Sequence, residues 1–310
     1  MIGISLEAAS WRGAFIAGVL RAFGERGIYP DLVSGSSSGA CNGFGYVSVQ
    51  LEMLTDNWIR LASQPMIDFR PRVRKANGGS LFNMSRIYRM ALEHGLGPTA
   101  IETLANSPTE LLVVCTRLVD EASDSDYWND HFLIHYPVIR GMARLAGRTI
   151  PPPPFEVEVF SSRSHPMRKY PREVLYASGR IPILYAVRAN VCGQSYIDGG
   201  FLQKNPVASL LDRGCDRVLA IISNPDGIVR ESFFHGGESD LVRAERRTGR
   251  ISVIHPKQEL GLSKYYWSIK KVSRAVRLGI EAGEAFLAQE GDQFFDGGTA
   301  MSASPGWQPD

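Results

Sequence analysis

The feature that most limits how this chain can fold is the sequence GSSSG at residues 35–39, together with what lies on either side of it. Residues 31–34 are predicted to form a short strand before it, and the apolar residues 40–49 a buried helix after it. The pattern G-x-S-x-G between a strand and a helix is typical of a sharp turn that holds its central serine at the carboxyl end of a sheet. The dipole and free amides of a helix amino terminus favour negative charge there. This setting predicts a nucleophilic serine, Ser37, in an α/β fold.

Other interpretations of this glycine-containing turn are weaker. Gly35 and Gly39 are expected where neighbouring side chains would collide with a tight turn or with the adjacent strand. Taken alone, the five residues also fit an ordinary Gly-Ser loop. No Gly-Lys-Ser/Thr follows, which excludes a phosphate-binding P-loop, and Gly43 and Gly45 lack a third glycine at Ser48, which argues against a dinucleotide-binding loop. In an ordinary α/β-hydrolase the serine turn follows several strands, whereas only one earlier strand is predicted here.

Predicted strands and helices alternate along the rest of the chain. Strands are predicted at residues 2–6, 111–118, 218–223 and 251–254, a hairpin at 186–198, and helices at 13–26, 84–92, 172–178, 205–214 and 264–289. The largely apolar strand at 111–118 favours a central parallel strand. Asn205 and Pro206 are predicted to be the N-cap and the first position of their helix. The alternation predicts a three-layer α/β/α fold with a mostly parallel central sheet.

Polar and proline-rich stretches interrupt this alternation. Residues 64–80 are rich in Arg, Pro, Gly and Asn, residues 121–130 are acidic and polar, and the four prolines at 151–154 exclude a helix. We therefore expect one domain over residues 1–310, with inserted lid or surface segments at about 64–110 and 119–170 and a tail at about 291–310.

Composition and charge exclude several classes of function. With 44% hydrophobic and 21% charged residues, the chain can bury a large core and is not disordered. Its net charge of +2 gives no reason to expect nucleic acid as a partner. No apolar run reaches the ~18 residues of a membrane span, and the first strand contains Ser5 and is followed by Glu7, so neither a transmembrane segment nor a signal peptide is visible. A cytoplasmic location is therefore expected.

Nothing in the sequence predicts a metal ion or a cofactor. The four cysteines are far apart and form no CxxC, which fits reduced thiols better than disulfides or a zinc site. They are Cys41, Cys115, Cys192 and Cys215. His131 and His135 are four residues apart, but Pro137 and the strand-like residues 132–134 argue against a helix that presents both histidines to a metal.

A second chemical candidate is Asp198, which ends the predicted hairpin and is followed by two glycines. An aspartate in this position can project into a cleft while the glycines let the backbone turn in close packing. An ordinary turn is the alternative, because Asp-Gly pairs are common in turns and Asp296 begins the same tripeptide in the predicted tail. Asp198 is therefore a candidate only in combination with Ser37.

Taken together, these residues resemble the patatin-like phospholipase family. The resemblance rests on the order of Ser37 and Asp198, on the sequence SGRIP at residues 178–182, and on the run from Asp198 that reads Asp-Gly-Gly-x-x-x-x-Asn-Pro. It extends over about residues 1–49 and 176–223. The resemblance implies a lipid or other acyl ester as substrate and a Ser-Asp dyad without histidine, with Ser37 as the nucleophile and Asp198 as the base.

The chemistry that this dyad implies is consistent. The carboxylate of Asp198 takes the hydroxyl proton of Ser37 during attack, returns it to the leaving alcohol, and then activates water to hydrolyse the acyl-enzyme. A carboxylate with its ordinary pKa of ~4 is a weak base for a hydroxyl. Burial of the carboxylate, or a hydrogen bond to its protonated form, is therefore required.

The family's oxyanion hole is formed by amides of a glycine-rich turn, G-G-G-x-[R/K]-G, after its first strand. The corresponding residues here are Ala8, Ala9, Ser10, Trp11, Arg12 and Gly13, so all three leading glycines are replaced. A residue other than glycine in a left-handed conformation costs about 1–2 kcal/mol, so this turn is strained or follows another path. Ala8, Ala9, Ser10 and Trp11 keep their amides, which predicts weak or specialised hydrolysis rather than none. Arg12 is expected either to anchor an anionic group or to close the turn through backbone carbonyls.

Two alternative functions stay open. His235 and His255 follow Asp198 in the order that a Ser-Asp-His esterase of the ordinary α/β-hydrolase class requires, although each also fits an ordinary loop or strand-end histidine. The second alternative is a catalytically weak or silent module that binds lipid or protein, because the oxyanion turn is altered.

A basic segment lies at residues 243–277, where ten lysines and arginines against two glutamates give a local net charge of +8. The ten are Arg243, Arg246, Arg247, Arg250, Lys257, Lys264, Lys270, Lys271, Arg274 and Arg277. Tyr265, Tyr266, Trp267 and Ile269 interleave with these cations, which is compatible with peripheral contact at an anionic membrane surface; a solvated helix face is the alternative. A second basic cluster, near the predicted lid, consists of Arg70, Arg72, Arg74 and Lys75.

Overall fold

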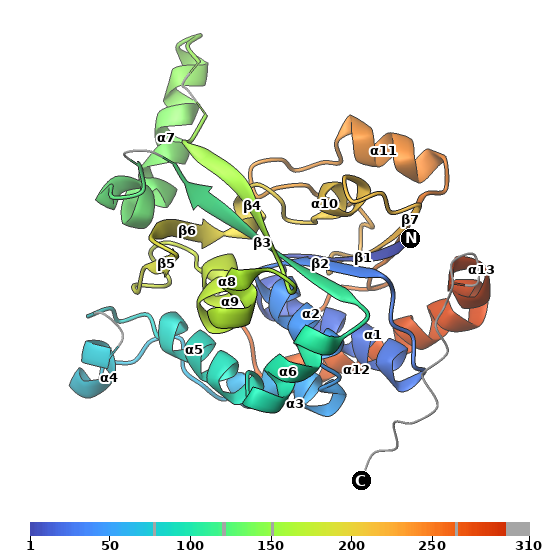
Figure 1. The fold of residues 1–310 in the computed structure, drawn as a ribbon. Helices are drawn as coiled ribbons and strands as arrows, with labels where there is room; N and C mark the ends of the chain where they lie inside the picture. Colours follow the sequence, from blue (N-terminus) through green and yellow to red (C-terminus); the bar gives the residue numbers. More distant parts are fainter. Residues whose placement is uncertain (77–78, 120–121, 150–151, 264–265, 296–310) are drawn as a thin grey trace.

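An eight-stranded sheet forms the centre of the protein in the computed structural model, which describes residues 1–76, 79–119, 122–149, 152–263 and 266–295 (Figure 1). The strands are β1 (Ile2–Leu6), β2 (Leu32–Ser36), β3 (Glu110–Leu118), β4 (Phe155–Ser161), β5 (Ala189–Val191), β6 (Gln194–Asp198), β7 (Arg217–Ile221) and β8 (Ile251–Ile254). Their order is β5-β6-β3-β2-β1-β7-β8, with β4 paired to β3. Strands β3, β2, β1, β7 and β8 run parallel, whereas β4 and β6 are antiparallel to β3 and β5 is antiparallel to β6. The predicted mostly parallel sheet is confirmed, although β3 is parallel only to β2.

Helices cover both faces of this sheet. They are α1 (Gly13–Glu25), α2 (Ser38–Val47), α3 (Leu51–Leu61), α4 (Pro71–Ala76), α5 (Met84–Gly95), α6 (Pro98–Asn106), α7 (Phe132–Leu145), α8 (His165–Lys169), α9 (Pro171–Gly179), α10 (Val207–Leu211), α11 (Asp240–Arg247), α12 (Ile269–Phe286) and α13 (Asp292–Phe295). Shorter 3₁₀ and π turns are η1 (Ser10–Arg12), η3 (Tyr127–His131), η4 (Gly199–Phe201) and η5 (Leu287–Gly291).

Two hydrophobic cores lie one on each face of the sheet. Along β7, Leu219 belongs to the core that includes α1, α2 and α12, whereas the adjacent Val218 belongs to the core that includes α10 and α11. Successive side chains of a strand point to opposite faces, so the two cores are separated by the sheet. The predicted three-layer α/β/α architecture is therefore confirmed.

The helices α1 and α12 pack backbone against backbone through two glycines. A Cβ at Gly18 would lie 2.1 Å from the carbonyl oxygen of Val276, and a Cβ at Gly279 would lie 2.0 Å from the carbonyl oxygen of Phe15. No side chain fits at such distances. This contact joins the carboxyl-terminal part of the chain to the amino-terminal helix that precedes the serine turn.

The segment at 132–134, predicted as strand-like, is instead the start of α7. Phe132 and Tyr136, one helical turn apart, are both buried. The ring centroid of Phe132 lies 5.2 Å from that of Phe155 and 5.4 Å from that of Phe201. Tertiary burial of these rings outweighs the local preference for a strand, and the helix also accommodates Pro137.

The start of α10 also differs from the prediction. Asn205 does not cap the helix: the helix begins at Val207 with Pro206 as its N-cap. The side-chain amide of Asn205 donates to the carbonyl oxygen of Arg230 at 3.0 Å instead. A tertiary contact has taken the place of the local cap.

The segments predicted as insertions take part in the fold to different extents. Residues 64–110 carry α4, α5 and α6, which lie outside the sheet, together with the first residue of β3. Residues 119–170 carry η3, α7, β4 and α8, and β4 is a full member of the sheet through its pairing with β3. The second segment is therefore not a surface excursion throughout.

The predicted tail begins with packed structure. Phe294 and Phe295 lie in α13 and are buried, with ring centroids 5.8 Å and 6.4 Å from that of Phe286. Residues 296–310, including Asp296, lie outside the described residues, as do residues 264 and 265 before α12.

Candidate active site

Two strands share one edge of β3. Strand β4 pairs with residues 112–118 along one edge, so β6, which pairs with residues 115–117, must use the opposite edge. Strand β2 pairs with residues 110–114 on that opposite edge. Because β2 is parallel and β6 antiparallel to β3, the carboxyl ends of β2 and β6 face each other at the middle of β3.

Both predicted catalytic residues belong to this junction. Ser36, the last residue of β2, pairs with Val114, and Asp198, the last residue of β6, pairs with the residue after Val114. A Cβ at Gly199 would lie 3.1 Å from the hydroxyl oxygen of Ser36 and 2.2 Å from the carbonyl oxygen of Val114, so this approach requires glycine. Since Ser37 directly follows β2, the sheet brings Ser37 and Asp198 to one place.

Ser37 lies in a strained turn between β2 and α2. Its φ of 56° and ψ of −124° lie outside the regions that residues other than glycine normally adopt. The two flanking glycines make the turn possible: a Cβ at Gly35 would lie 2.6 Å from the carbonyl oxygen of Gly39, and a Cβ at Gly39 would lie 2.3 Å from that of Leu6. The predicted sharp turn from strand to helix is present at these residues.

The hydroxyls on either side of Ser37 hold the turn in place. The Ser36 hydroxyl donates to the carbonyl oxygen of Gln203 at 2.6 Å. The Ser38 hydroxyl accepts a hydrogen bond from the Ala9 amide at 3.0 Å. Both side chains therefore have structural partners in neighbouring loops.

Ser178 supports the turn through the backbone of Ser37. The Ser37 amide donates to the Ser178 hydroxyl oxygen at 2.9 Å, and the Ser178 hydroxyl donates to the carbonyl oxygen of Val114 at 2.7 Å. Ser178 is fully buried at the end of α9. Sequence reasoning gave this residue no role, and its place in the SGRIP sequence was the signal available.

A largely apolar cavity of about 950 Å³, including its open mouth, lies beside Ser37. Its walls come from α2, α3, α5 and α9. Six of the apolar side chains that line it are Phe44, Leu54, Trp58, Ile87, Leu92 and Leu175. A cavity with this apolar lining suits an apolar group such as an acyl chain.

Asp198 is fully buried and is not itself among the residues that line this cavity. Its Oδ1 accepts from the Gly200 amide at 2.7 Å, and its own amide donates to the carbonyl oxygen of Arg180 at 2.8 Å. Burial raises the pKa of Tyr185 far above its ordinary value, and the charge of Asp198 raises it further. Burial likewise raises the pKa of Cys41 to about 12, with a smaller rise from Asp198. Because Tyr185 and Cys41 line the cavity, the Asp198 carboxylate raises the pKa of two groups in the cavity wall.

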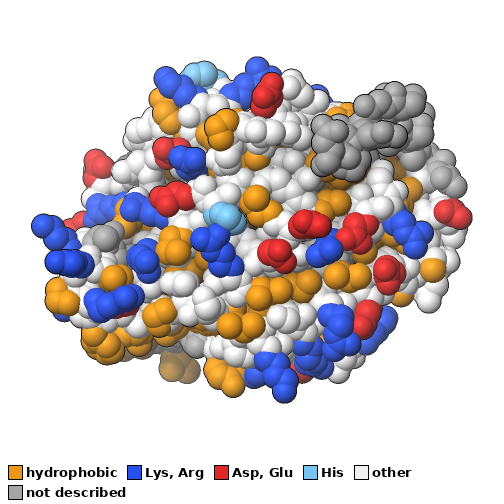
Figure 2. Space-filling model, turned by 90° about the horizontal axis from the view of Figure 1, so that it is seen from below, with side chains coloured by type: hydrophobic (Ala, Val, Ile, Leu, Met, Phe, Trp, Pro, Cys, Tyr) orange, Lys and Arg blue, Asp and Glu red, His pale blue; other side chains and the backbone are white. Residues whose placement is uncertain are grey.

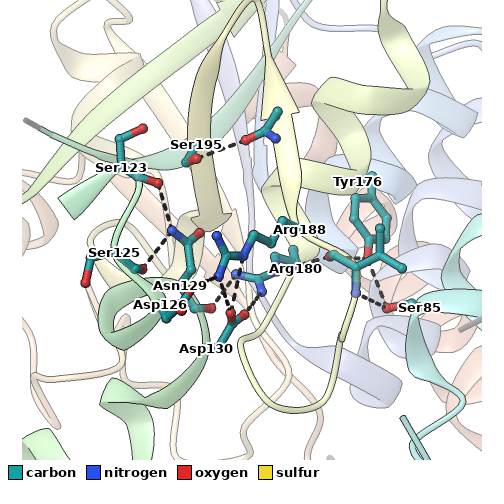
Figure 3. A network of polar contacts seen from close by, with 12 residues as sticks. Ser85, Ser123, Ser125, Asp126, Asn129, Asp130, Tyr176, Arg180, Arg188 and Ser195 are labelled. Atoms are coloured by element: carbon teal, nitrogen blue, oxygen red, sulfur yellow. Dashed lines mark hydrogen bonds and ion pairs between the residues drawn. The ribbon is translucent and has the colours of Figure 1, made fainter. Parts of the chain in front are cut away.

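Arg180, in the SGRIP sequence, holds the backbone beside β6 (Figure 3). Its fully buried guanidinium donates to the carbonyl oxygens of Val187 at 3.2 Å and Asn129 at 2.7 Å, and to the carboxylate of Asp130 at 2.7 Å. Arg188 reaches the same carboxylate at 2.7 Å from a more exposed position. Burial lowers the pKa of Arg180, and its hydrogen bond to Asp130 offsets part of that shift. The cluster links η3 to the segment after α9.

We expect Arg180→Met to lower the free energy of unfolding by about 3 kcal/mol, because buried carbonyls and the Asp130 carboxylate lose their donors. Urea denaturation followed by circular dichroism measures the change. Arg188→Met is the matched control: its ion pair is partly exposed, so a loss of about 1 kcal/mol or less is expected. Equal losses for the two variants would show that Arg180 has no special structural role.

The turn after β1 uses two of its amides inside the protein. The Ala8 amide donates to the carbonyl oxygen of Lys204 at 2.8 Å, and the Ala9 amide donates to the Ser38 hydroxyl. Neither residue lines the cavity. Ala8 and Ala9, expected from the sequence as oxyanion donors, are therefore already occupied by protein acceptors.

Ser10 and Trp11 are the residues of this turn that line the cavity. Ser10 has a φ of 51°, the left-handed conformation expected where the family has glycine. Within the described parts of the chain, the amides of Ser10 and Trp11 have no protein acceptor. Of the four amides expected in the oxyanion turn, these two are therefore not used by the protein in the described residues.

The side chains of Trp11 and Arg12 secure the turn. The Trp11 ring is buried, stacked on Trp267 with a centroid distance of 4.3 Å and edge-on to Trp58 at 5.9 Å. The Arg12 guanidinium donates to the side-chain oxygen of Asn224, in the loop after β7. Arg12 thus closes the turn through a side chain, not through the backbone carbonyls considered from the sequence.

The two histidines considered for a triad have other neighbours. The Nδ1 of His235 lies 3.2 Å from the Ser232 hydroxyl oxygen, and the Nδ1 of His255 lies 3.1 Å from the carbonyl oxygen of Pro256. Neither histidine lines the cavity that contains Ser37. Among the described residues there is no group of three or more His, Cys, Asp or Glu side chains that could hold a metal ion.

The basic segment at 243–277 does not form one surface. Its helix α11 packs in one core and its helix α12 in the other, on opposite sides of the sheet (Figure 1). In α11 the guanidinium of Arg243 pairs with Asp240 at 2.9 Å. Near α12, the exposed ring of Tyr266 lies 3.9 Å from the ammonium of Lys271. Two residues of the segment, Lys264 and Tyr265, lie outside the described residues.

Basic side chains also gather near α4. Figure 2 shows lysine and arginine side chains at the end of the molecule where α4 lies, with hydrophobic side chains beside them. Phe69 is largely exposed there, and Arg70 pairs with Asp68 at 2.5 Å. The hydrogen bonds from Arg70 lower the pKa of Asp68 to about 2. No helix in the described part of the chain is long and apolar enough to cross a bilayer.

The sequence from residue 4 to residue 211 matches the family model of patatin-like phospholipases. The chain belongs to the patatin-like phospholipase family. A search among curated proteins gave no match. Two solved structures are similar: VipD from Legionella pneumophila, with 15% identity and a TM-score of 0.42, and the type III effector protein ExoU, with 12% identity and a TM-score of 0.40. Each similarity covers 93% of this chain but only 66% of VipD and 52% of ExoU, less than two thirds of either protein.

Proposed function

We propose that the protein is a serine-dependent lipid acyl hydrolase, a phospholipase A or a less specific ester hydrolase, that uses a Ser37–Asp198 dyad. The observation that carries this proposal is the junction of β2 and β6. A serine in a strained turn lines an apolar cavity there, and a buried carboxylate ends the strand that meets it. Membership of the patatin-like phospholipase family supports a lipid ester as the substrate.

In the proposed reaction the Ser37 oxygen attacks the ester carbonyl carbon while the Asp198 carboxylate takes the hydroxyl proton. The tetrahedral intermediate collapses, and Asp198 returns the proton to the departing alcohol. Water then attacks the acyl-enzyme, Asp198 takes a proton from the water, and Ser37 recovers one as the fatty acid leaves. The Gly200 amide fixes one carboxylate oxygen throughout.

Stabilisation of the oxyanion is assigned to Ser10 and Trp11. Both residues line the cavity with Ser37, and their amides are not occupied by the protein in the described residues. The amino terminus of α2, which starts at Ser38, adds a favourable dipole. Each amide of this kind contributes about 10²-fold to 10³-fold in rate.

A fluorophosphonate probe tests the proposal directly. We expect covalent modification of Ser37 and of neither Ser36 nor Ser38, because the hydroxyls of the last two are occupied by Gln203 and Ala9. A long-chain alkyl probe should react at least about tenfold faster than an ethyl probe, because the cavity buries its methylene groups. Peptide mass spectrometry identifies the modified serine.

The control for labelling is the Ser37→Ala protein, which should stay unmodified at the same probe concentration. Labelling at Ser36 or Ser38 in the unchanged protein would contradict the assignment of the nucleophile. Equal rates for the long-chain and ethyl probes would show that the apolar cavity does not receive the acyl chain.

One observation favours a second candidate function, a catalytically silent lipid-binding module. The Ala8 and Ala9 amides are occupied by protein acceptors, so two of the donors expected in the family's oxyanion turn are lost. This alternative predicts that long-chain lipid binds in the cavity while Ser37 resists the probe and no acyl ester is hydrolysed.

Peripheral contact with a membrane also belongs to the proposal, because a lipid hydrolase must reach its substrate in a bilayer. The cytoplasmic location expected from the sequence stays a prediction. Cell fractionation of the tagged full-length protein tests both.

A further inference from the structure

We infer that α7 is an interfacial helix that docks the protein on an anionic lipid surface. The helix carries four large apolar side chains in one stripe at the spacing i, i+4, i+8 and i+11. These side chains are strongly exposed: Ile134 by 56%, Val138 by 59%, Met142 by 66% and Leu145 by 91%. A stripe of this kind stabilises a helix only when an apolar environment covers it.

The charges on α7 and just after its end identify the partner. Arg140, Arg144 and Arg148 follow each other at intervals of four residues, and all three are exposed. At 100° per residue Arg140 and Arg144 lie on the side of α7 opposite Met142, whereas Arg148 follows the end of the helix at Leu145. No aspartate or glutamate occurs between residues 131 and 149. Arginines on the polar face of a helix that carries an apolar stripe fit acidic lipid headgroups, whereas the arginines of two facing copies would repel each other.

The base of α7 is anchored in the hydrophobic core, although its outer part is exposed. Phe132 and Tyr136 are buried, and the ring of Phe132 packs at 5.4 Å from Phe201. Just before the helix, Asn129 and Asp130 accept hydrogen bonds from the buried Arg180 (Figure 3). A helix fixed at its base can transfer its membrane attachment to the whole domain.

The direction of α7 relates it to the candidate active site. The chain reaches α7 from the carboxyl end of β3, and the helix extends away from the sheet there (Figure 1). Strands β1 and β2 are parallel to their neighbours in the order β3-β2-β1, so they end at the same edge, where Ser37 lies. Docking through α7 therefore brings the edge that carries the serine toward the lipid.

Vesicle cosedimentation with the Ser37→Ala protein tests this inference without hydrolysis of the lipid. The vesicles are phosphatidylcholine alone, or phosphatidylcholine with roughly a third phosphatidylserine. We expect binding to the mixed vesicles. The serine variant V138S/M142S/L145S should weaken it at least about tenfold, and the glutamine variant R140Q/R144Q/R148Q about tenfold to a hundredfold. High salt should weaken vesicle binding by the protein with unchanged α7 more than vesicle binding by the glutamine variant.

The matched control is L241S/R243Q in α11, which also removes an exposed apolar side chain and an exposed arginine. This variant should bind the mixed vesicles as the parent does. Circular dichroism and thermal unfolding of every variant should match the parent, because the changed side chains are exposed. Loss of binding in the α11 variant, with α7 variants unaffected, would overturn the inference.

Two further results would overturn it. One is a parent protein that does not bind the mixed vesicles. The other is a parent that is dimeric by light scattering and becomes monomeric in V138S/M142S/L145S, because a second copy would then cover the stripe. The inference rests on the proposed function only in explaining why the protein would dock on lipid. With Ser37 intact, hydrolysis of a short, water-soluble ester should be equal with and without the α7 changes. Failure of that hydrolysis would count against the proposed function and leave the vesicle result standing.

Discussion

Replacing Ser37 with alanine is expected to lower hydrolysis of a long-chain acyl ester by about 10⁴-fold or more and to leave the fold intact. The reason is that no other hydroxyl of the turn is free to attack: those of Ser36 and Ser38 hold neighbouring loops. Initial rates with a fluorogenic long-chain ester measure the loss. Thermal unfolding measures whether the fold is kept.

Ser36→Ala is the matched control for this prediction. It removes one hydrogen bond to Gln203, so we expect a loss of about 1 kcal/mol in stability and most of the activity retained. Ser37→Gly separates stability from activity. Glycine relieves the left-handed conformation and should raise the free energy of unfolding by about 1 kcal/mol, yet this variant should be as inactive as Ser37→Ala. Activity near the parent level in either Ser37 variant would remove this residue from the mechanism.

The serine turn could be predicted from the sequence because the pattern that describes it is local. A side chain at position 35 would collide with the backbone of Gly39, four residues later. A side chain at position 39 would collide with the backbone of Leu6, at the end of the adjacent strand. A strand, a turn and a helix follow one another within a few residues, so a short pattern describes the whole geometry. The three layers followed from the alternation of strands and helices for the same reason.

The residues that meet Ser37 could not be found from local patterns. Asp198 reaches the turn because β6 occupies the part of the β3 edge that β2 leaves open, which is a pairing between distant segments. The family resemblance supplied Asp198, whereas the role of Ser178 became visible only in the structure. Strand pairing at long range depends on the complete fold.

Local patterns also could not predict which amides of the oxyanion turn are available to a substrate. The Ala8 amide is used because the carbonyl of Lys204 lies beside it. Lys204 is held there by a buried ion pair with Glu7, which also accepts from the Ser223 amide at 2.6 Å. Contacts among the segments around residues 7, 204 and 223 thus determine whether the Ala8 amide can bind a substrate, and no sequence motif predicts these contacts.

Charge counts in the sequence were misleading for a related reason. The basic segment at 243–277 looks continuous, but β8 lies between its two helices and the chain crosses from one face of the sheet to the other. The sequence at 132–134 favours a strand locally, so the exposed apolar stripe of α7 could not be predicted. Buried aromatic rings at the base of α7 determine its helical conformation instead.

Replacing Asp198 with asparagine is the second change for which we expect a loss of about 10⁴-fold or more. Asparagine keeps the shape of the side chain, and its carbonyl oxygen can still accept from the Gly200 amide. What it cannot do is take a proton from Ser37 or from water. The expected result is therefore a folded protein that binds long-chain ester with a KM near that of the parent and a kcat near the background.

The same measurement on the histidines decides between the dyad and the ordinary triad. His235→Ala and His255→Ala should each keep kcat/KM within about threefold of the parent, because neither ring lines the cavity and each has a partner elsewhere. If one histidine variant loses activity as Asp198→Asn does, the base is an imidazole and Asp198 only orients it. If Asp198→Asn alone loses activity, and a slow fluorophosphonate reaction at Ser37 persists in it, the carboxylate is the group that moves the proton. That probe needs the serine oxygen, but its fluoride leaves without the protonation that a departing alcohol requires.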